Sequence, residues 1–346
     1  MTDTSSPTGF GKNEAVDSFS RKISYLRLSV TDRCNLRCSY CDSGKDRGNN
    51  PVKLEHGDLL AYEEILRVVG VAAGMGISKI RLTGGEPLVR KNFLSFVERL
   101  AALDGVEDIR LTTNGVLFER YAAELLRAGI RKVNISLDSL KPERFARITS
   151  VDCFHRVRGA IDTALRLGFA SVKLNMVVMR GINDDELLDF ASLSLRERLQ
   201  VRFIEYMPMG GSRDRSRKLY VSNDEIMDKV GRLGELEPVE RGMGAGPARV
   251  YRLAPKAPGT VGFISPISHK FCEACNRLRL TSEGRLRSCL LHDGEFDIRR
   301  VLRSGGSDEE IRQTLLTAVR SKPRGHELQS ENAAGGCHGR MSRIGG

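Results

Sequence analysis

The chain has 346 residues, of which 40% are hydrophobic and 29% are charged, so it is long enough to bury a sizeable core. Its net charge is +11, and the basic residues are scattered along the chain without a lysine–arginine run or an aromatic–basic patch. The charge alone therefore does not show whether the protein binds nucleic acid, binds a small polyanion or has no anionic partner. Residues 1–20 lack an apolar signal region and no apolar stretch is long enough to span a bilayer, so we expect a cytoplasmic protein without a membrane partner.

Short strand-like runs alternate with helical patterns from about residue 22 to 210. In one helical pattern, Ile65, Val68, Val69 and Ala72 recur at the spacing of one helix face. Six such repeats predict parallel strands joined by helices. The expected strands are Tyr25–Val30, Lys79–Thr83, Asp108–Thr112, Lys132–Leu137, Ser171–Val178 and Arg202–Tyr206.

Each of these strands ends in polar or glycine-rich residues. A barrel brings all such ends to one mouth, whereas an open doubly wound sheet uses mainly its switch point. We therefore predict an α/β fold with a partial (β/α)6 barrel of the TIM type. The polar ends are the cysteines after the first strand, Gly84–Pro87, Thr112–Gly115, Ser136–Asp138, Lys173–Asn175 and the segment from Glu205.

The pattern changes beyond residue 211. We expect a helix near Ser222–Leu233, a flexible turn at Gly242–Gly246, strands at Arg249–Leu253 and Val261–Ser265, and a helix begun by a Ser307/Glu310 capping box. The glycine-rich end should be an extended tail. The expected organisation is a flexible N-terminus (1–20), the barrel (21–210), a C-terminal domain with a second metal centre (211–330) and the tail (331–346).

Three cysteines stand in CNLRCSYC, at Cys34, Cys38 and Cys41. Three thiolates can hold three irons of a [4Fe–4S] cluster and leave the fourth iron open to a small molecule. A structural zinc site is the alternative, but such sites usually have four protein ligands. The spacing therefore favours a reactive cluster.

A second set comprises Cys272, Cys275 and Cys289, again three ligands without a fourth at zinc-ribbon spacing. A zinc site completed by His269 or His292 remains open on spacing alone. Two incomplete triplets in one chain favour two clusters. Cys153 is expected to be a small buried hydrophobe, and Cys337 is a weaker candidate for a fourth ligand.

Basic residues accompany these motifs. Arg277 and Arg279 alternate on one strand and so point the same way, which suits a clamp for phosphate or a base edge. Arg27 and Arg81 lie within the first two strands, and Lys173 lies on the fifth. Either internal salt bridges or a shared anionic ligand could balance them, and the ligand accounts for several at once. In Gly84–Pro87, the glycines would let backbone approach a ligand, and Glu86 could accept from an ammonium group.

The first cysteine motif followed by GGEP resembles the radical S-adenosylmethionine (radical SAM) superfamily. YLRLSVTDRCNLRCSYC, IRLTGGEPLVR, LTTNG, NISLDSL, FCEACNRLRLT and the terminal GG together are similar to the GTP 3′,8-cyclase family, over nearly the whole chain from about residue 10. One departure is that Asp42-Ser43-Gly44 follows the third cysteine, where the family usually has Met-Pro.

The resemblance implies a lyase that uses S-adenosylmethionine and two [4Fe–4S] clusters to convert GTP in the first step of molybdenum cofactor biosynthesis. The second cluster would bind guanine through its open iron, and Gly345 and Gly346 would reach into the active site beside Arg277 and Arg279. S-adenosylmethionine contacts are implied at Tyr40, Gly85, Ser136 and Met207. GTP contacts are implied at Arg27, Arg81, Thr112, Lys173, Arg277, Leu278 and Arg279.

The implied partners are GTP, an electron donor of the flavodoxin or ferredoxin type and, downstream, cyclic pyranopterin monophosphate synthase. The sequence does not set the oligomeric state, and a homodimer is one arrangement to test. Two alternatives remain: another radical SAM enzyme with an auxiliary cluster, such as a peptide maturase, and a basic zinc protein that binds nucleic acid. With the family in view, we expect no nucleic-acid partner.

Overall fold

The computed structural model describes residues 14–41, 53–207, 217–240, 246–326 and 341–345. One twelve-stranded sheet runs through it in the order β12-β11-β10-β1-β2-β3-β4-β5-β6-β9-β8-β7. The strands are β1 (Tyr25–Ser29), β2 (Lys79–Thr83), β3 (Asp108–Thr113), β4 (Lys132–Ser136), β5 (Ser171–Val178), β6 (Gln200–Glu205), β7 (Glu237–Pro238), β8 (Arg249–Arg252), β9 (Thr260–Ile264), β10 (Arg277–Leu280), β11 (Arg285–Arg287) and β12 (Glu295–Asp297).

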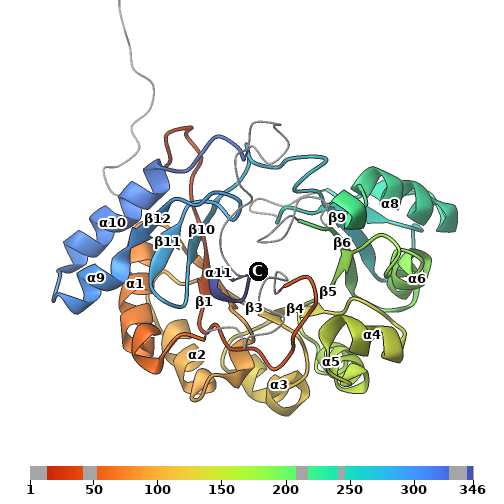
Figure 1. The fold of residues 1–346 in the computed structure, drawn as a ribbon, viewed down its shortest axis with the longest axis horizontal. Coiled ribbons are helices and arrows are strands. Elements are labelled where there is room, and N and C mark those ends of the chain that lie inside the picture. Colours follow the sequence, from red (N-terminus) through yellow and green to blue (C-terminus); the bar gives the residue numbers. More distant parts are fainter. Residues whose placement is uncertain (1–13, 42–52, 208–216, 241–245, 327–340, 346) are drawn as a thin grey trace, which may run out of the picture.

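The helices lie mainly on the outer side of the curved sheet (Figure 1). The α-helices are α1 (Tyr62–Gly74), α2 (Phe93–Ala101), α3 (Phe118–Arg127), α4 (Pro142–Thr149), α5 (Phe154–Arg166), α6 (Leu187–Arg196), α8 (Asn223–Val230), α9 (Ile298–Arg303), α10 (Asp308–Arg320) and α11 (Met341–Ile344). Three 3-10 turns are η1 (His56–Asp58), η2 (Pro87–Val89) and η3 (Gly231–Leu233). Within the described residues, no helix has the length and apolar character needed to cross a bilayer.

Strands β1 to β6 pair in parallel in chain order, as the repeated strand–helix pattern predicts. The sheet begins and ends at different strands rather than closing, so the predicted partial six-unit barrel is confirmed. The predicted strand bounds agree to within two residues, the largest difference being the start of β6 at Gln200 instead of Arg202.

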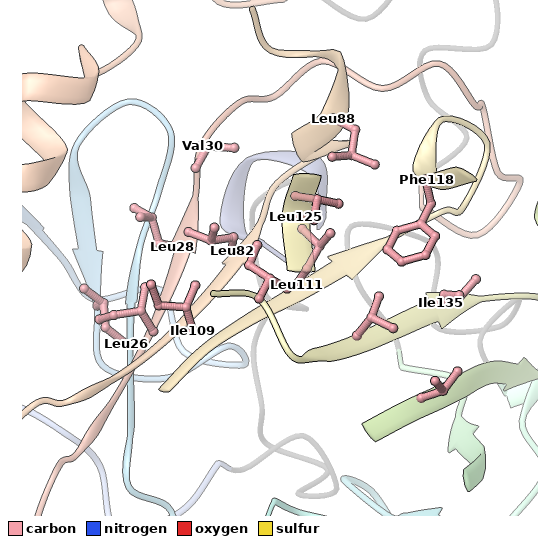
Figure 2. Packing of buried hydrophobic residues seen from close by; sticks show 14 of the residues in the cluster. Leu26, Leu28, Val30, Leu82, Leu88, Ile109, Leu111, Phe118, Leu125 and Ile135 are labelled. Carbon is pink, nitrogen blue, oxygen red and sulfur yellow. The ribbon is translucent and has the colours of Figure 1, made fainter. Parts of the chain in front are cut away.

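The core lies between the sheet and the outer helices. Strand β5 shows why, because its buried and partly exposed residues alternate along its whole length. Leu26, Leu28, Leu82 and Leu111 come from three adjacent strands and belong to one buried cluster (Figure 2). Their neighbours along each strand therefore face the concave side.

The C-terminal segment extends this sheet at both edges. Strand β10 pairs in parallel with β1, and β9 pairs in parallel with β6. Strands β11, β12, β8 and β7 then continue outward in antiparallel pairs. The expected strands at Arg249–Leu253 and Val261–Ser265 are present within one residue, and the capping box at Ser307 and Glu310 begins α10 as predicted.

Two expectations about the chain ends differ from the structure. In the part of the N-terminus that is described, Ala15 and Asp17 are buried and Val16 forms a bridge to Lys22, so these residues pack against the fold instead of being flexible. At the other end, Met341–Ile344 is helical rather than extended, because the burial of Ile344 holds it against the sheet. Most of the Gly242–Gly246 turn, Asp42-Ser43, Cys337 and Gly346 lie outside the described residues.

Candidate functional site

A cavity of about 320 Å³ lies on the concave side of the sheet. Its lining includes all six cysteines of the two triplets, which come from segments more than 200 residues apart in the chain. A cavity of this size can enclose a small molecule. The structure thus brings the two predicted metal-binding motifs to one space.

The first triplet lies in the loop after β1, and the glycines of GGEP determine how that loop sits. A Cβ atom at Gly84 or Gly85 would collide with the backbone of Thr31 or Arg33. Gly85 N donates to Thr31 O at 2.8 Å, and Glu86 N donates to Arg33 O at 2.8 Å. The glycines are therefore needed for a close approach between two backbone segments, next to the first cysteine.

The Glu86 carboxylate accepts hydrogen bonds from the protein itself, whereas we expected it to accept from an ammonium group of a ligand. It is fully buried and accepts from Thr113 Oγ1 at 2.8 Å, from the Asn114 amide at 2.7 Å and from the Leu88 amide at 3.1 Å. Burial raises the pKa of its carboxyl to about 7. Its role in the structure is to join the ends of β2 and β3.

The sulfur atoms of the first triplet have donors nearby. Leu36 N lies 3.4 Å from Cys34 Sγ, and Asn114 Nδ2 lies 3.6 Å from the same sulfur. Cys41 N donates to Cys38 O at 3.0 Å, which closes a turn between these two cysteines. Without a metal, burial raises the pKa of the Cys34 and Cys38 thiols.

Tyr40, within the first triplet, is tied to the barrel by Asp138, a residue whose role sequence reasoning missed. Tyr40 Oη donates to Asp138 Oδ2 at 2.8 Å, and Asp138 Oδ1 accepts from the Val177 amide at 2.9 Å. Burial raises the pKa of Asp138 to about 6. This carboxyl connects the cysteine loop to β4 and β5.

The second triplet flanks β10 and β11. Leu291 N lies 3.4 Å from Cys289 Sγ, and Cys275 N donates to Cys272 O at 3.1 Å. Burial acts to raise the pKa of Cys275, but the nearby charges of Arg277 and Lys322 outweigh it and lower the pKa to about 7. The hydrogen bonds resemble those of the first triplet, but the pKa of Cys275 is lowered whereas those of Cys34 and Cys38 are raised.

The histidines considered as zinc ligands are engaged elsewhere. His269 Nε2 pairs with Asp224 at 2.7 Å, and His292 Nδ1 accepts from the Gly294 amide at 3.1 Å. Among the described residues, no three Cys, His, Asp or Glu side chains are grouped so as to hold a single metal ion. The lone Cys153 is buried in the core, as expected. The fit to clusters therefore rests on the donor set: three thiols in each triplet, with N–H groups close to the sulfurs.

Four arginines form a row on the face of the sheet that lines the cavity. The strand register places Arg279, Arg27, Arg81 and Arg110 side by side on β10, β1, β2 and β3. All four line the cavity. Burial and the neighbouring arginines Arg279 and Arg81 hold the pKa of Arg27 well below its ordinary value. Arg110 forms an ion pair with Asp108 at 2.5 Å, and an anionic ligand in the cavity would balance further positive charge of the row.

Two further cations lie on β5 and β6. Burial lowers the pKa of Arg202 to about 9, with the Arg81 charge adding to the effect. Burial, reinforced by Arg202 and Arg81, lowers the pKa of Lys173 to about 6. Arg110 and Arg202 were not among our candidates, although both line the cavity as the candidates Arg27 and Arg81 do.

Most of the predicted contact residues meet at this cavity. Tyr40, Gly85, Ser136, Met207, Arg27, Arg81, Thr112, Arg277 and Arg279 all line it. Lys173 and Leu278 are not among the described lining residues. Leu278 is buried in the core because it alternates with Arg277 and Arg279, so only its backbone could contact a ligand there.

Helix α11 and Gly345 lie in the same region (Figure 1). Arg279 donates to the Gly345 carbonyl, and Ile344 packs with Met207, Leu290 and Leu291. Gly345 has φ +79°, and a Cβ atom there would lie 2.6 Å from Thr83 Cγ2. The expected approach of the tail to Arg279 is thus present at Gly345.

Most of the chain is similar to known proteins. Residues 28–193 match the radical SAM superfamily, and residues 199–328 match the family described as Molybdenum Cofactor Synthesis C. GTP 3′,8-cyclase of Thermodesulfovibrio yellowstonii is 48% identical over 89% of this chain and 94% of its own length. GTP 3′,8-cyclase of Heliobacterium modesticaldum is also 48% identical, over 96% of this chain and all of its own length.

Among solved structures, Streptococcus suis SuiB is similar with a TM-score of 0.58 at 12% identity, over 88% of this chain and 68% of SuiB. SuiB bound to S-adenosylmethionine gives a TM-score of 0.56 at 14% identity, over 86% of this chain and 68% of that one. These two likenesses concern the fold alone. From the identity to the curated relatives, the chain belongs to the GTP 3′,8-cyclase family of the radical SAM superfamily.

Proposed function

We propose that the protein is a lyase that converts GTP into (8S)-3′,8-cyclo-7,8-dihydroguanosine 5′-triphosphate, the first step of molybdenum cofactor biosynthesis. The relatives that bear the name GTP 3′,8-cyclase cover nearly the whole chain. The observation that carries the proposal is the row of Arg279, Arg27, Arg81 and Arg110 inside a cavity that both cysteine triplets line.

The arginine row would bind the triphosphate. Guanidinium groups make short charge-assisted hydrogen bonds with phosphate, frequently in pairs. Arg81 is oriented by Tyr25 Oη and by Thr112 Oγ1, the latter at 3.2 Å. Lys173 and Arg202 would add positive charge from the neighbouring strands, and Arg277 and the Leu278 backbone would contact the nucleotide from β10.

The cysteines would hold the cofactors. Cys34, Cys38 and Cys41 would bind one [4Fe–4S] cluster, and Cys272, Cys275 and Cys289 would bind a second. A cluster with bound S-adenosylmethionine supplies a 5′-deoxyadenosyl radical that can remove a hydrogen atom from a substrate. Tyr40, Gly85, Ser136 and Met207 would contact S-adenosylmethionine. The share of the protein is to position the two molecules and match their charges.

The proposal includes partners that follow from the reaction. An electron donor of the flavodoxin or ferredoxin type would reduce the first cluster, and cyclic pyranopterin monophosphate synthase would use the product. Gel filtration of the reconstituted protein would show whether it is a homodimer.

A substrate comparison tests the proposal. Anaerobically reconstituted protein is incubated with S-adenosylmethionine, a reductant and, in separate reactions, GTP, ATP, CTP or a cysteine-containing peptide. We expect 5′-deoxyadenosine together with the cyclised nucleotide only with GTP, measured by liquid chromatography and mass spectrometry. A modified peptide without any nucleotide product would favour the maturase alternative, and a colourless protein that retains zinc instead of iron would exclude both radical enzymes.

A further inference from the structure

Lys322 is buried beside the second cysteine triplet, just after α10. The residue is 4% exposed, and its Nζ donates to Arg277 O at 2.8 Å and to Ser288 O at 2.6 Å. Arg277 lies two residues after Cys275, and Ser288 immediately precedes Cys289. One amino group thus ties together the two segments that carry these cysteines.

A second cation, the partly buried Arg21, also holds the segment of Cys272 but has a carboxylate partner. Its Nη1 donates to Cys272 O at 2.6 Å, while its Nε forms an ion pair with Asp17 at 2.5 Å. Lys322 has no carboxylate partner in the described part of the chain. The positive charge of Lys322, unlike that of Arg21, is therefore not balanced by a carboxylate among the described residues.

The hydrogen-bond capacity of Lys322 is also incomplete. An ammonium group has three N–H donors, and the two carbonyl oxygens take two of them. Lys322 lines the cavity that the cysteines line. Burial lowers its pKa, and negative charge on Cys275 and Cys289 acts in the opposite direction. The thiolates of the second triplet are thus the charges that can compensate this buried cation.

We propose that Lys322 is a positioning residue of the second metal centre that also tunes its reduction potential. Its ammonium fixes the Cys275 and Cys289 segments relative to each other and supplies positive charge beside their thiolates. The potential of an iron–sulfur cluster depends on net charge and on hydrogen bonds to its sulfurs, and a nearby cation favours the reduced form. The inference rests on the proposed function, because it takes the second triplet as a cluster site.

The test isolates the second centre. In a C34A/C38A/C41A background, only the second triplet remains to bind a cluster. Lys322→Arg, Lys322→Gln and Lys322→Met are made in that background and reconstituted anaerobically. Arg keeps the charge, Gln keeps N–H donors without the charge, and Met removes both. Iron and sulfide per chain are measured, together with the midpoint potential by titration monitored with electron paramagnetic resonance.

We expect Lys322→Arg to retain the iron content and potential of the background protein, and Lys322→Gln to shift the potential to a more negative value. Lys322→Met should show the same shift or lose iron. Lys270→Met is the matched control, because Lys270 lies two residues before Cys272 and also donates to a carbonyl, His326 O at 3.1 Å, but is exposed. Its loss should leave the potential unchanged, since solvent screens an exposed charge.

Equal potentials in the background protein and in Lys322→Gln would overturn the inference, as would a shift in Lys322→Arg as large as that in Lys322→Gln. Loss of iron from Lys322→Arg would also overturn it, because the positive charge is kept. Failure of the background protein itself to bind iron is a different result: it would count against the second cluster and thus against the proposed function.

Discussion

Replacement of Arg279 by methionine should separate the stability of the ligand-free protein from its binding of GTP. Burial, with the charge of Arg277, lowers the pKa of Arg279 to about 10. The fall from the ordinary arginine value corresponds to roughly 3 kcal/mol of unfavourable charging. The substitution also removes the hydrogen bond from the Arg279 guanidinium to the Gly345 carbonyl, which is worth about 1.5–3 kcal/mol because its donor is charged. The two contributions oppose each other and are similar in size, so the ligand-free variant should be about as stable as the parent protein.

Binding of GTP, in contrast, should become weaker. A hydrogen bond from a charged group contributes about 1.5–3 kcal/mol, so the affinity for GTP should fall roughly 10- to 150-fold. We would measure thermal unfolding of the anaerobic, reconstituted protein with and without GTP, and use Arg279→Lys as the variant that keeps the charge. Cyclisation should fall more than uncoupled cleavage of S-adenosylmethionine, and the same should hold for Arg277. A clear loss of ligand-free stability with an unchanged response to GTP would refute the reasoning, and equal loss of both activities would refute the assigned role.

Three other changes test separate parts of the site. Burial lowers the pKa of Lys173 to about 6, so at pH 8 this residue is mostly neutral without ligand. A bound triphosphate should raise that pKa, so that Lys173 takes up roughly one proton on binding. Calorimetry in buffers of different ionisation enthalpy would measure the uptake, and Lys173→Met should abolish it. No uptake by the parent protein would contradict this. Gly345→Ala places a Cβ 2.6 Å from Thr83 Cγ2, so it should displace the tail and lower cyclisation while the iron content stays unchanged; normal cyclisation would show that the tail contact is dispensable. Asp138→Ala leaves a buried N–H and the Tyr40 hydroxyl without their acceptor, which should cost about 1–3 kcal/mol and lower the melting temperature. An unchanged melting temperature would refute that link, and Asp138→Asn, which keeps one acceptor, should lose less.

The six barrel strands could be predicted from sequence because the information is local. In Ser171–Val178, apolar residues alternate with others, and that pattern alone identifies a strand with one buried face. Strand β6 begins at Gln200, two residues before the predicted start at Arg202. In the structure the Gln200 amide Nε2 donates to Thr260 Oγ1 at 3.1 Å, a contact with a strand that lies 60 residues further along the chain.

The features of the site that could not be predicted from the sequence depend on the pairing of strands that lie far apart in the chain. The register between Arg27 and Arg279 joins strands about 250 residues apart, and no local pattern specifies it. Arg110 and Arg202 could have been found, because each lies on the cavity face of a strand that was correctly predicted. The helical tail could not have been found, since its four residues are ordered by the burial of Ile344 rather than by helix propensity.

The register between β10 and β1 determines which of their side chains line the cavity. In β1, Arg27 stands between Leu26 and Leu28, and in β10, Arg279 stands between Leu278 and Leu280. A shift of register by one residue, with each strand turned accordingly, would put leucines on the cavity face and arginines in the core. Burying unpaired guanidinium groups among the core leucines would cost several kcal/mol, so the apolar face fixes the register. The arginines are thereby brought together on the concave side, where Asp108 forms an ion pair with Arg110 at 2.5 Å and a bound anion would add further negative charge. In this fold, the leucines that hold the C-terminal segment on the barrel therefore also assemble the arginine row that we propose binds the triphosphate.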